Sequence, residues 1–350
     1  KSDSRHVFTL RQYLLALLDS RGLTRTLGEI DVCRDEQGRP CFSAGNSAAV
    51  FRIRLGGRIR SLRCYLRPMR HLKEIYGQRL LEKELYLHTS PETGVWVDTV
   101  LGDWIEGSTL HETVAQAAAL RDRESLQILV RLFDRLALAL VTDDRAHGDL
   151  KPENIIVGDD GTLCPIDFDA SYLPAFAGEI SPELGTAAYQ HPARTAADFD
   201  ERIDDYPAAL ISTALHALAE DPTLWDRYGS SDGLLYTPQR IASDPAYRET
   251  LALFEKRGMA VQYRIAQLLT APTLRLFGLA ELLAEAVREK PAARSGTEAE
   301  TPELFVENGR WGYRTAERVV VAPLYDNGFD FTEGLAAVQL GGTWHYIDTA

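Results

Sequence analysis

The sequence has few cysteines and no long apolar run, and both absences exclude classes of protein. Cys33, Cys41, Cys64 and Cys164 show neither CxxC spacing nor a histidine partner at zinc-site spacing. We therefore expect reduced, mostly buried thiols. No apolar run approaches the roughly 18 to 20 residues that a membrane-spanning helix needs, and the N-terminus KSDSRHVF lacks the apolar centre of a signal peptide. A cytoplasmic protein without a membrane partner is expected.

Basic charge is also scarce, with 38 Lys and Arg against 51 Asp and Glu and a formal net charge of −13. Nucleic-acid binders gather positive charge, so no nucleic-acid partner is expected. The absence of an HExxH pattern disfavours metalloprotease chemistry. What remains is an ordinary globular composition, with 45% hydrophobic and 25% charged residues. At 350 residues the chain exceeds one hydrophobic core, which indicates two lobes or two domains.

The pattern of apolar residues changes along the chain. Helical spacing predicts an amphipathic helix over 8–21, and short alternating runs between Gly-containing turns predict an antiparallel meander over 30–66. A helix is then predicted over 69–84, and a strand at GVWVDTVLGDWI. Two further short strands are predicted around NIIV and TLCPID. The remainder of the chain up to residue 289 is predicted to be mainly helical, with helices over 109–120, 124–143, 204–219, 246–257 and 275–289.

The last part of the chain returns to β texture after a segment rich in Pro, Ala, Ser, Gly, Thr and Glu, which is typical of a linker. GRWGY matches GTWHY there, with Trp311 and Trp344 separated by 33 residues. The match indicates one period and the start of a second. Because the chain opens at Lys1 without Met and stops partway through this second period, we expect it to be part of a longer protein.

The segment HGDLKPENIIV, residues 147–157, carries the strongest chemical signal. Phosphoryl transfer needs a carboxylate that orients the attacking hydroxyl, a cation beside the moving group and oxygen ligands for Mg²⁺. Asp149, Lys151 and Asn154 supply these three in one short loop. Thirteen residues after Asn154, the sequence IDFD places Asp167 directly after a predicted strand, where a second carboxylate for Mg²⁺ would be needed.

This constellation resembles the H-R-D-L-K-x-x-N loop and the D-F-G motif of eukaryotic-like Ser/Thr protein kinases. The resemblance extends from about residue 40 to 290 and implies ATP and Mg²⁺ as cofactors and a protein as substrate. It implies catalytic roles for Asp149 and Lys151, and magnesium binding by Asn154 and Asp167. GTAAYQHPA resembles the end of an activation segment, and Asp204 in IDDYPAALISTAL resembles the acid that braces the catalytic loop.

The same resemblance implies further nucleotide-binding residues. Gly45 opens a loop that would cover the phosphates, and Asp103 and Trp104 begin the connector that would contact adenine. Arg63 stands where these kinases have a phosphate-gripping lysine. Its helix carboxylate partner is left open among three residues, Glu74, Glu82 and Glu84.

Three positions depart from the kinase pattern and bear on regulation. Gly148 replaces an arginine that, in many of these kinases, pairs with a phosphorylated residue of the activation loop. Activity is therefore not expected to require phosphorylation of that loop. Asp169 replaces a flexible glycine and would either lie near the metals or face solvent. Ala193 stands in place of a glutamate that normally anchors the activation segment.

The C-terminal block resembles WG repeats through GRWGY, APLYD, FTEGLAAV and GTWHY. These repeats imply either a binding surface for a protein partner or a β cap. The expected class is α+β: a bilobal protein-kinase-like fold followed by a short β-rich segment. Its parts are an N-terminal helical extension (1–29), a small β-rich lobe (30–102), a large α-helical lobe (103–290), a linker (291–304) and the WG-repeat segment (305–350).

The leading hypothesis is a bacterial Ser/Thr kinase that transfers the γ-phosphoryl group of Mg-ATP to a protein hydroxyl. Three alternatives stay open. Arg63, Asp169 and Ala193 are compatible with a pseudokinase that binds nucleotide or acts as a scaffold. HGD in place of HRD is typical of small-molecule phosphotransferases of the aminoglycoside or choline kinase type. The third alternative is a non-enzymatic interaction module in which the repeats carry the function.

Overall fold

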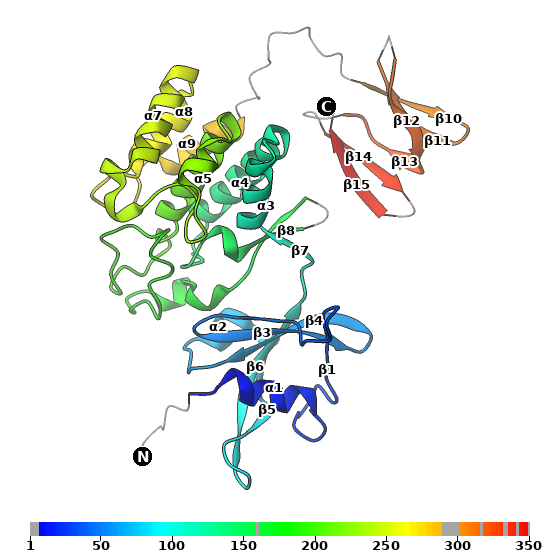
Figure 1. The fold of residues 1–350 in the computed structure, drawn as a ribbon, viewed down its shortest axis with the longest axis vertical. Helices are drawn as coiled ribbons and strands as arrows, with labels where there is room; N and C mark the ends of the chain where they lie inside the picture. The colour runs from blue at the N-terminus through cyan, green and yellow to red at the C-terminus, as the bar shows by residue number, and fades with distance from the viewer. Residues whose placement is uncertain are drawn as a thin grey trace. The chain divides into compact units, whose positions relative to one another are not determined.

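The computed structural model describes residues 7–158, 161–288, 302–315, 318–331, 335–340 and 343–348. The chain divides into two compact units, 1–158 with 163–287, and 159–162 with 288–350. The first is a mixed α/β unit and the second is rich in β-strands (Figure 1). Among the helices of the described residues, none has the length and apolarity to cross a bilayer. Of the four cysteines, expected to be mostly buried, Cys64 is buried and the other three are half-buried.

A six-stranded antiparallel sheet forms the N-terminal part of the first unit. Its order is β1-β3-β4-β6-β5, with β2 paired to β3. Alternation along β3 buries Phe51 and Ile53 while Arg54 is exposed, as expected for a sheet with one face on the core. The strands are β1 Asp31–Val32, β2 Phe42–Ala44, β3 Ala48–Leu55, β4 Arg58–Tyr65, β5 Leu80–His88 and β6 Gly94–Asp103.

The predicted N-terminal helix is present as α1, Leu10–Leu18, and belongs to the core of this sheet. Thr9 and Gln12 form a capping box, in which each side chain bonds the other residue's backbone N–H and so satisfies the helix start. Tyr13 and Leu17 are fully buried against strand residues, and the Tyr13 hydroxyl donates to the Tyr65 carbonyl at 2.6 Å. The segment 8–21 is therefore integrated into the sheet-bearing part of the unit.

The helix predicted over 69–84 is wrong for most of its length. Helix α2 covers only Leu72–Tyr76, the 3-10 turn η1 covers Gly77–Arg79, and the next nine residues are strand β5. Gly77 turns the chain out of the helix with a positive φ of 54°. The segment LLEKELYLH has residues that favour helices, but it pairs antiparallel with β6 from Leu80↔Val100 to His88↔Gly94. Tertiary strand pairing thus overrides local helix propensity.

Helices dominate the remainder of the first unit. All sixteen residues of α5 except two are buried, so this helix is the centre of the core and not an amphipathic surface helix. Helices α6 and α8 were not predicted. The helices are α3 Leu110–Ala119, α4 Arg123–Thr142, α5 Asp205–Glu220, α6 Leu224–Tyr228, α7 Pro245–Arg257, α8 Ala260–Leu268 and α9 Leu279–Arg288.

Short elements connect these helices and carry the loops that matter for function. Strands β7, β8 and β9 form a small antiparallel sheet, in which β8 and β9 are the strands predicted at NIIV and TLCPID. The strands are β7 Gly107–Thr109, β8 Ile155–Gly158 and β9 Leu163–Pro165, and the 3-10 turns are η2 Pro152–Asn154, η3 Phe168–Ala170, η4 Pro174–Phe176 and η5 Pro238–Ser243.

The second unit consists of two three-stranded antiparallel sheets, β10-β11-β12 and β13-β14-β15. The self-matching segments GRWGY and GTWHY form β11 and β15, and each is the second strand of a hairpin. Tyr313, Ala336 and Val338 are buried together in a small core, where the Tyr313 hydroxyl donates to the Phe329 carbonyl at 2.7 Å. The strands are β10 Glu303–Glu307, β11 Arg310–Arg314, β12 Val319–Tyr325, β13 Asn327–Gly328, β14 Leu335–Leu340 and β15 Thr343–Asp348.

Candidate active site

The loop 147–154 is held in place by a buried carboxylate at the start of α5. Asp204 accepts hydrogen bonds from the backbone N–H groups of His147 and Gly148, the latter at 3.0 Å. Burial raises the pKa of Asp204, while His147 and the two N–H groups favour its charged form. Gly148 has a φ of 81°, and a Cβ there would lie 2.0 Å from the Ala170 carbonyl oxygen. Sterics therefore require glycine at this position.

Asp149 and Lys151, the two predicted catalytic residues, meet at Thr186 in the GTAAY segment. The backbone N–H of Thr186 donates to Asp149 Oδ1 at 2.6 Å. Lys151 Nζ donates to Thr186 Oγ1 at 2.9 Å and lies 3.6 Å from Asp149 Oδ2. The Asp149 carboxylate, the Lys151 ammonium group and the Thr186 hydroxyl thus lie together. The sequence of the loop 147–154 alone did not predict the contribution of Thr186.

The GTAAYQHPA segment is anchored without the glutamate that Ala193 replaces. Arg194, the next residue, is buried, and its Nη1 donates to the Gly148 carbonyl at 3.0 Å and to the Gln190 side chain. Burial lowers the pKa of Arg194, but the nearby Asp204 and Asp149 favour its charge. The segment is therefore tied directly to the backbone of the catalytic loop.

Asn154 and Asp167 are brought together by the backbone. Asn154 Nδ2 donates to the Asp149 carbonyl at 2.9 Å, and the Ile166 N–H donates to the Asn154 carbonyl at 2.8 Å. His147 supports the same strand, since its Nε2 is 2.8 Å from the Ile166 carbonyl. Asp167 follows in a left-handed conformation with a φ of 66° and a side chain that is 39% exposed. An acidic residue on each of two neighbouring turns thus flanks Asn154.

The donor atoms at Asn154 and Asp167 fit a magnesium ion. The amide nitrogen of Asn154 is used by Asp149, so its side-chain oxygen is the atom that could bind a cation, together with the half-exposed Asp167 carboxylate. Mg²⁺ prefers such oxygen ligands and takes the rest of its octahedron from water and phosphate. Among the described residues, no cluster of three or more His, Cys, Asp or Glu has metal-binding geometry.

Arg63 lies in the middle of β4 and contacts two carboxylates from the IDFD segment. Its Nη1 donates to Asp167 Oδ1 at 2.8 Å and to Asp169 Oδ2 at 2.6 Å. The Arg63 side chain is 13% exposed. Burial disfavours the charge of the guanidinium, but Coulomb attraction by the two aspartates outweighs this effect and raises the pKa of Arg63. The arginine at the lysine position therefore faces the predicted metal carboxylate.

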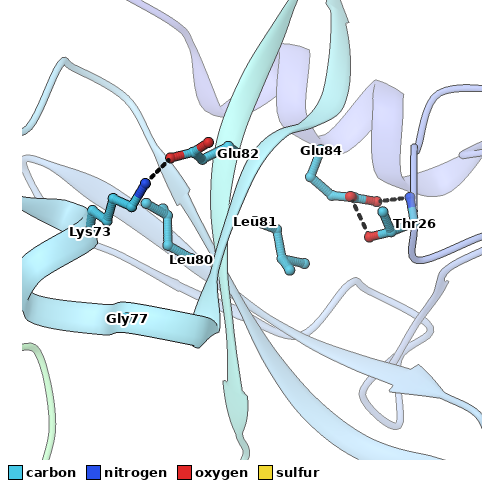
Figure 2. A pocket seen from close by; sticks show the side chains of 7 residues that line it. All are labelled: Thr26, Lys73, Gly77, Leu80, Leu81, Glu82 and Glu84. Atoms are coloured by element: carbon cyan, nitrogen blue, oxygen red, sulfur yellow. Dashed lines mark hydrogen bonds and ion pairs between the residues drawn. The ribbon is translucent and has the colours of Figure 1, made fainter.

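In the described part of the chain, none of the three candidate glutamates pairs with Arg63. Glu82 lies 3.5 Å from Lys73, and Glu84 is buried and accepts bonds from the backbone N–H groups of residues 25–27. Glu74 lies on the exposed side of α2. Figure 2 shows Glu82 and Glu84 around a separate hollow of about 330 Å³, lined by Thr26, Lys73, Gly77, Leu80, Leu81, Glu82 and Glu84. This hollow contains none of the predicted site residues.

Asp169 does not face solvent; it lies close to Asp167, the predicted metal ligand, because both carboxylates contact Arg63 Nη1. The side chain of Asp169 is only 4% exposed. Its Oδ1 accepts from the Tyr65 hydroxyl at 3.1 Å and from the Tyr76 hydroxyl at 2.6 Å. Burial and the adjacent charge of Asp169 raise the pKa of both tyrosines, which keeps them as donors. Sequence reasoning missed these tyrosines, although an aspartate in a glycine position signals the need for partners.

Gly45, Asp103 and Trp104 lie at the rim of the sheet and are joined mainly to β3 and β4. The Gly45 N–H donates to the Ala48 carbonyl at 2.9 Å in the short turn between β2 and β3. Asp103 is 88% exposed and lies 3.4 Å from Arg60. The Arg52 guanidinium lies over the Trp104 ring at 5.5 Å. Among the described residues, these contacts of Gly45, Asp103 and Trp104 do not extend to the loop 147–154.

One more contact links the rim to the activation-segment region. The Ser47 hydroxyl, in the turn that Gly45 opens, donates to Glu183 at 3.0 Å, and Arg67 also pairs with Glu183. Glu183 precedes Gly185 and Thr186 by only a few residues. The turn that was predicted to cover the phosphates is therefore bound to the same segment that contacts Asp149.

Part of the chain is similar in sequence to serine/threonine protein kinases. The chain is 28% identical over 172 residues to CBL-interacting protein kinase 17 from Oryza sativa subsp. japonica, covering 47% of this chain and 35% of that protein. It is 34% identical over 113 residues to serine/threonine-protein kinase PknL from Mycobacterium tuberculosis, covering 31% and 27% of the two chains. The chain thus spans about a third or less of the length of these relatives.

The C-terminal unit matches a different family model. Residues 314–344 match the WG containing repeat, which confirms the resemblance to WG repeats; the matched range includes Trp344 and begins three residues after Trp311. The chain therefore carries a WG repeat near its C-terminus and, over part of its length, is similar to serine/threonine protein kinases.

Proposed function

We propose that the first unit is a bilobal, protein-kinase-like domain that binds Mg-ATP and transfers its γ-phosphoryl group to a serine or threonine hydroxyl of a protein. One observation carries the proposal. Asn154 bonds the Asp149 carbonyl through its side chain and the Ile166 N–H through its backbone. Asp149 and Asp167 are thereby held on adjacent turns, as transfer between a hydroxyl and a metal-bound phosphate requires.

Each residue then has a definite task. The Asp149 carboxylate accepts a hydrogen bond from the incoming hydroxyl and orients it, and Lys151 places positive charge beside it. Asn154 and Asp167 are the oxygen ligands available to the cation. When Mg-ATP is bound, ATP would supply the phosphoryl group and Mg²⁺ would neutralise much of the negative charge on the phosphates. The Thr186 contacts to Asp149 and Lys151 support a protein substrate, because they connect the catalytic loop to the segment next to which a peptide would lie.

The first prediction tests Asp149. With labelled ATP, Mg²⁺ and a generic protein substrate, Asp149→Ala should lower label incorporation by about 10²-fold or more, because general-base and orienting roles have effects of that size. Asp19→Ala is the matched control, since Asp19 is a 70% exposed aspartate at the end of α1. Equal incorporation by wild type and Asp149→Ala would refute catalysis by this site.

A nucleotide-binding scaffold is the second candidate, and one contact favours it. Arg63 donates to Asp167 Oδ1 and so competes with a cation for that carboxylate. Nucleotide that raises the melting temperature without any label transfer would support this candidate. Label transfer to an amine or sugar but not to protein would instead indicate a small-molecule phosphotransferase.

The WG-repeat unit is proposed to bind a protein partner. Val306, Val319 and Leu324 on its strands are each more than half exposed, and exposed apolar side chains on one small unit favour association. Pull-down with the chain and with a Leu324→Glu variant would test the role of Leu324.

A further inference from the structure

The carboxylate that faces Arg63 comes from an unexpected segment of the chain. Helix α2 has only five residues, and the side chain it buries is Tyr76, whose hydroxyl bonds Asp169 at 2.6 Å. The helix therefore reaches the site with a neutral donor. The negative charge next to Arg63 is supplied from the turn after β9 instead, by Asp167 and Asp169.

The two aspartates are not equivalent. Asp167 is 39% exposed, whereas Asp169 is 4% exposed and has hydrogen bonds on both oxygens, from Arg63, Tyr65 and Tyr76. A carboxylate enclosed in this way uses most of its acceptor capacity within the protein. Asp169 is therefore a fixed anchor, and Asp167 remains the more accessible of the pair.

The anchor leaves most of the guanidinium for another partner. A guanidinium carries five N–H donors on three nitrogens, and the bonds to both aspartates use the single nitrogen Nη1. The planar fork of arginine matches phosphate oxygens in pairs. Because the buried Asp169 carboxylate holds Nη1, the N–H groups on the other two guanidinium nitrogens of Arg63 point in a fixed direction.

We propose that Asp169 is the positioning residue for Arg63, and that it replaces a carboxylate from α2 in holding the cation that grips nucleotide phosphates. The inference rests on the proposed function. Tyr65 and Tyr76 orient Asp169, and Asp169 orients Arg63. This chain of contacts also accounts for an aspartate at 169, where a flexible glycine would leave Arg63 without its buried partner.

The test is a double-mutant cycle that measures the binding of a fluorescent ATP analogue, N-methylanthraniloyl-ATP. Mg²⁺ is left out so that metal binding by Asp167 does not contribute to the affinity. Asp169→Asn and Arg63→Met should each weaken binding about 10-fold, the size of a lost hydrogen bond to a charged group. Because Asp169 acts through Arg63, the double variant should bind within about 2-fold of Arg63→Met. A merely structural role would give multiplied effects and would overturn the inference.

Asp31→Asn is the control, because Asp31 is a 73% exposed aspartate that lies 3.7 Å from Arg54 on the same sheet. It should bind the analogue like wild type. If Asp169→Asn does not fold, Tyr76→Phe takes its place in the cycle, with an expected weakening of about 3-fold from the loss of one hydrogen bond to the anchor.

The outcomes separate this inference from the proposed function. Analogue binding with the expected non-additivity but no label transfer would refute the proposed function alone. Label transfer by wild type with independent, multiplied effects in the cycle would refute the inference alone. Failure of the wild-type chain to bind the analogue without Mg²⁺ would overturn the inference, and failure to bind it with Mg²⁺ as well would overturn both.

Discussion

At the scale of single residues, the site depends on how charge is shared around Arg63. Its guanidinium bridges a half-exposed aspartate and a buried one, at 2.8 and 2.6 Å. Truncating either partner of a buried ion pair leaves an uncompensated charge, which is far more costly than losing an exposed pair. Substitutions at 63 and 169 should therefore affect folding and binding together, while substitution at 167 should act mainly on chemistry.

Asp167→Asn tests this distinction. The variant should lose about 10³-fold in phosphoryl transfer, because an amide is a poor substitute for a carboxylate that positions a cation. The melting temperature without nucleotide should change little, since Arg63 keeps Asp169 as its buried partner. Steady-state transfer assays and thermal unfolding, with Asp31→Asn as the control, would check both. Undiminished transfer by the variant would contradict the assignment of Asp167.

The proximity of the HGDLKPEN and IDFD segments was predictable, because both lie in one short stretch of the chain. Asp149, Lys151 and Asn154 fall within six positions, and Asp167 follows one short strand pair later. The tyrosines around Asp169 were not predictable, since Tyr65 lies on β4 and Tyr76 on α2, some 100 residues earlier in the chain. Only the packing of the sheet-bearing part on the IDFD turn brings them there.

At the scale of elements, helices of two or more regular turns were the easiest to predict. Helices α3, α4, α5, α7 and α9 lie close to their predicted ranges, because apolar periodicity over two or more turns is a strong local signal. Strand β5 was predicted as helix, because LLEKEL places leucines at helical spacing and Glu and Lys favour helices. The pairing of β5 with β6 and the hydrogen bonds from residues 25–27 to Glu84 are tertiary contacts. A local sequence pattern does not predict such contacts.

Protonation of Asp205 in helix α5 should make the free energy of unfolding depend on pH. Asp205 lies in its first turn and accepts from the Leu276 N–H at 3.1 Å. Burial raises the pKa of Asp205 from 3.8 to about 6, against the opposing effects of that N–H and Arg202. A carboxyl whose pKa is higher in the folded state stabilises the fold below the unfolded pKa, and this contribution is lost as pH rises through the folded pKa.

Asp205→Asn should therefore be more stable than wild type above pH 6, by about 1–3 kcal/mol for a shift of this size. The amide oxygen can still accept from the Leu276 N–H. The advantage should shrink as pH falls from about 6 to about 4, which urea unfolding at several pH values would measure. Asp19→Asn controls for the loss of one exposed negative charge. A difference from wild type that is the same at pH 4 and pH 7 would contradict the role of Asp205.

At the scale of the whole molecule, the chain has separate hydrophobic cores. Those of the first unit draw on the sheet and the helices, whereas Tyr313, Ala336 and Val338 form a core made only of residues from the second unit. The sequence predicted this division from the linker composition and from the match between GRWGY and GTWHY. It could not predict that the two matching strands end equivalent hairpins in two different sheets.

Separate cores should unfold separately. Tyr313 has no exposed surface, and its hydroxyl bonds the Phe329 carbonyl, so Tyr313→Ala should destabilise the second unit by about 3 kcal/mol or more. Hydrogen exchange should then lose protection in peptides from 303–348 while peptides from α5 keep theirs, because the described residues in the core of α5 all belong to the first unit. Phe329→Ala, at a 59% exposed position, is the control and should leave both regions protected. Loss of protection in α5 together with the second unit would mean that the two cores unfold as one.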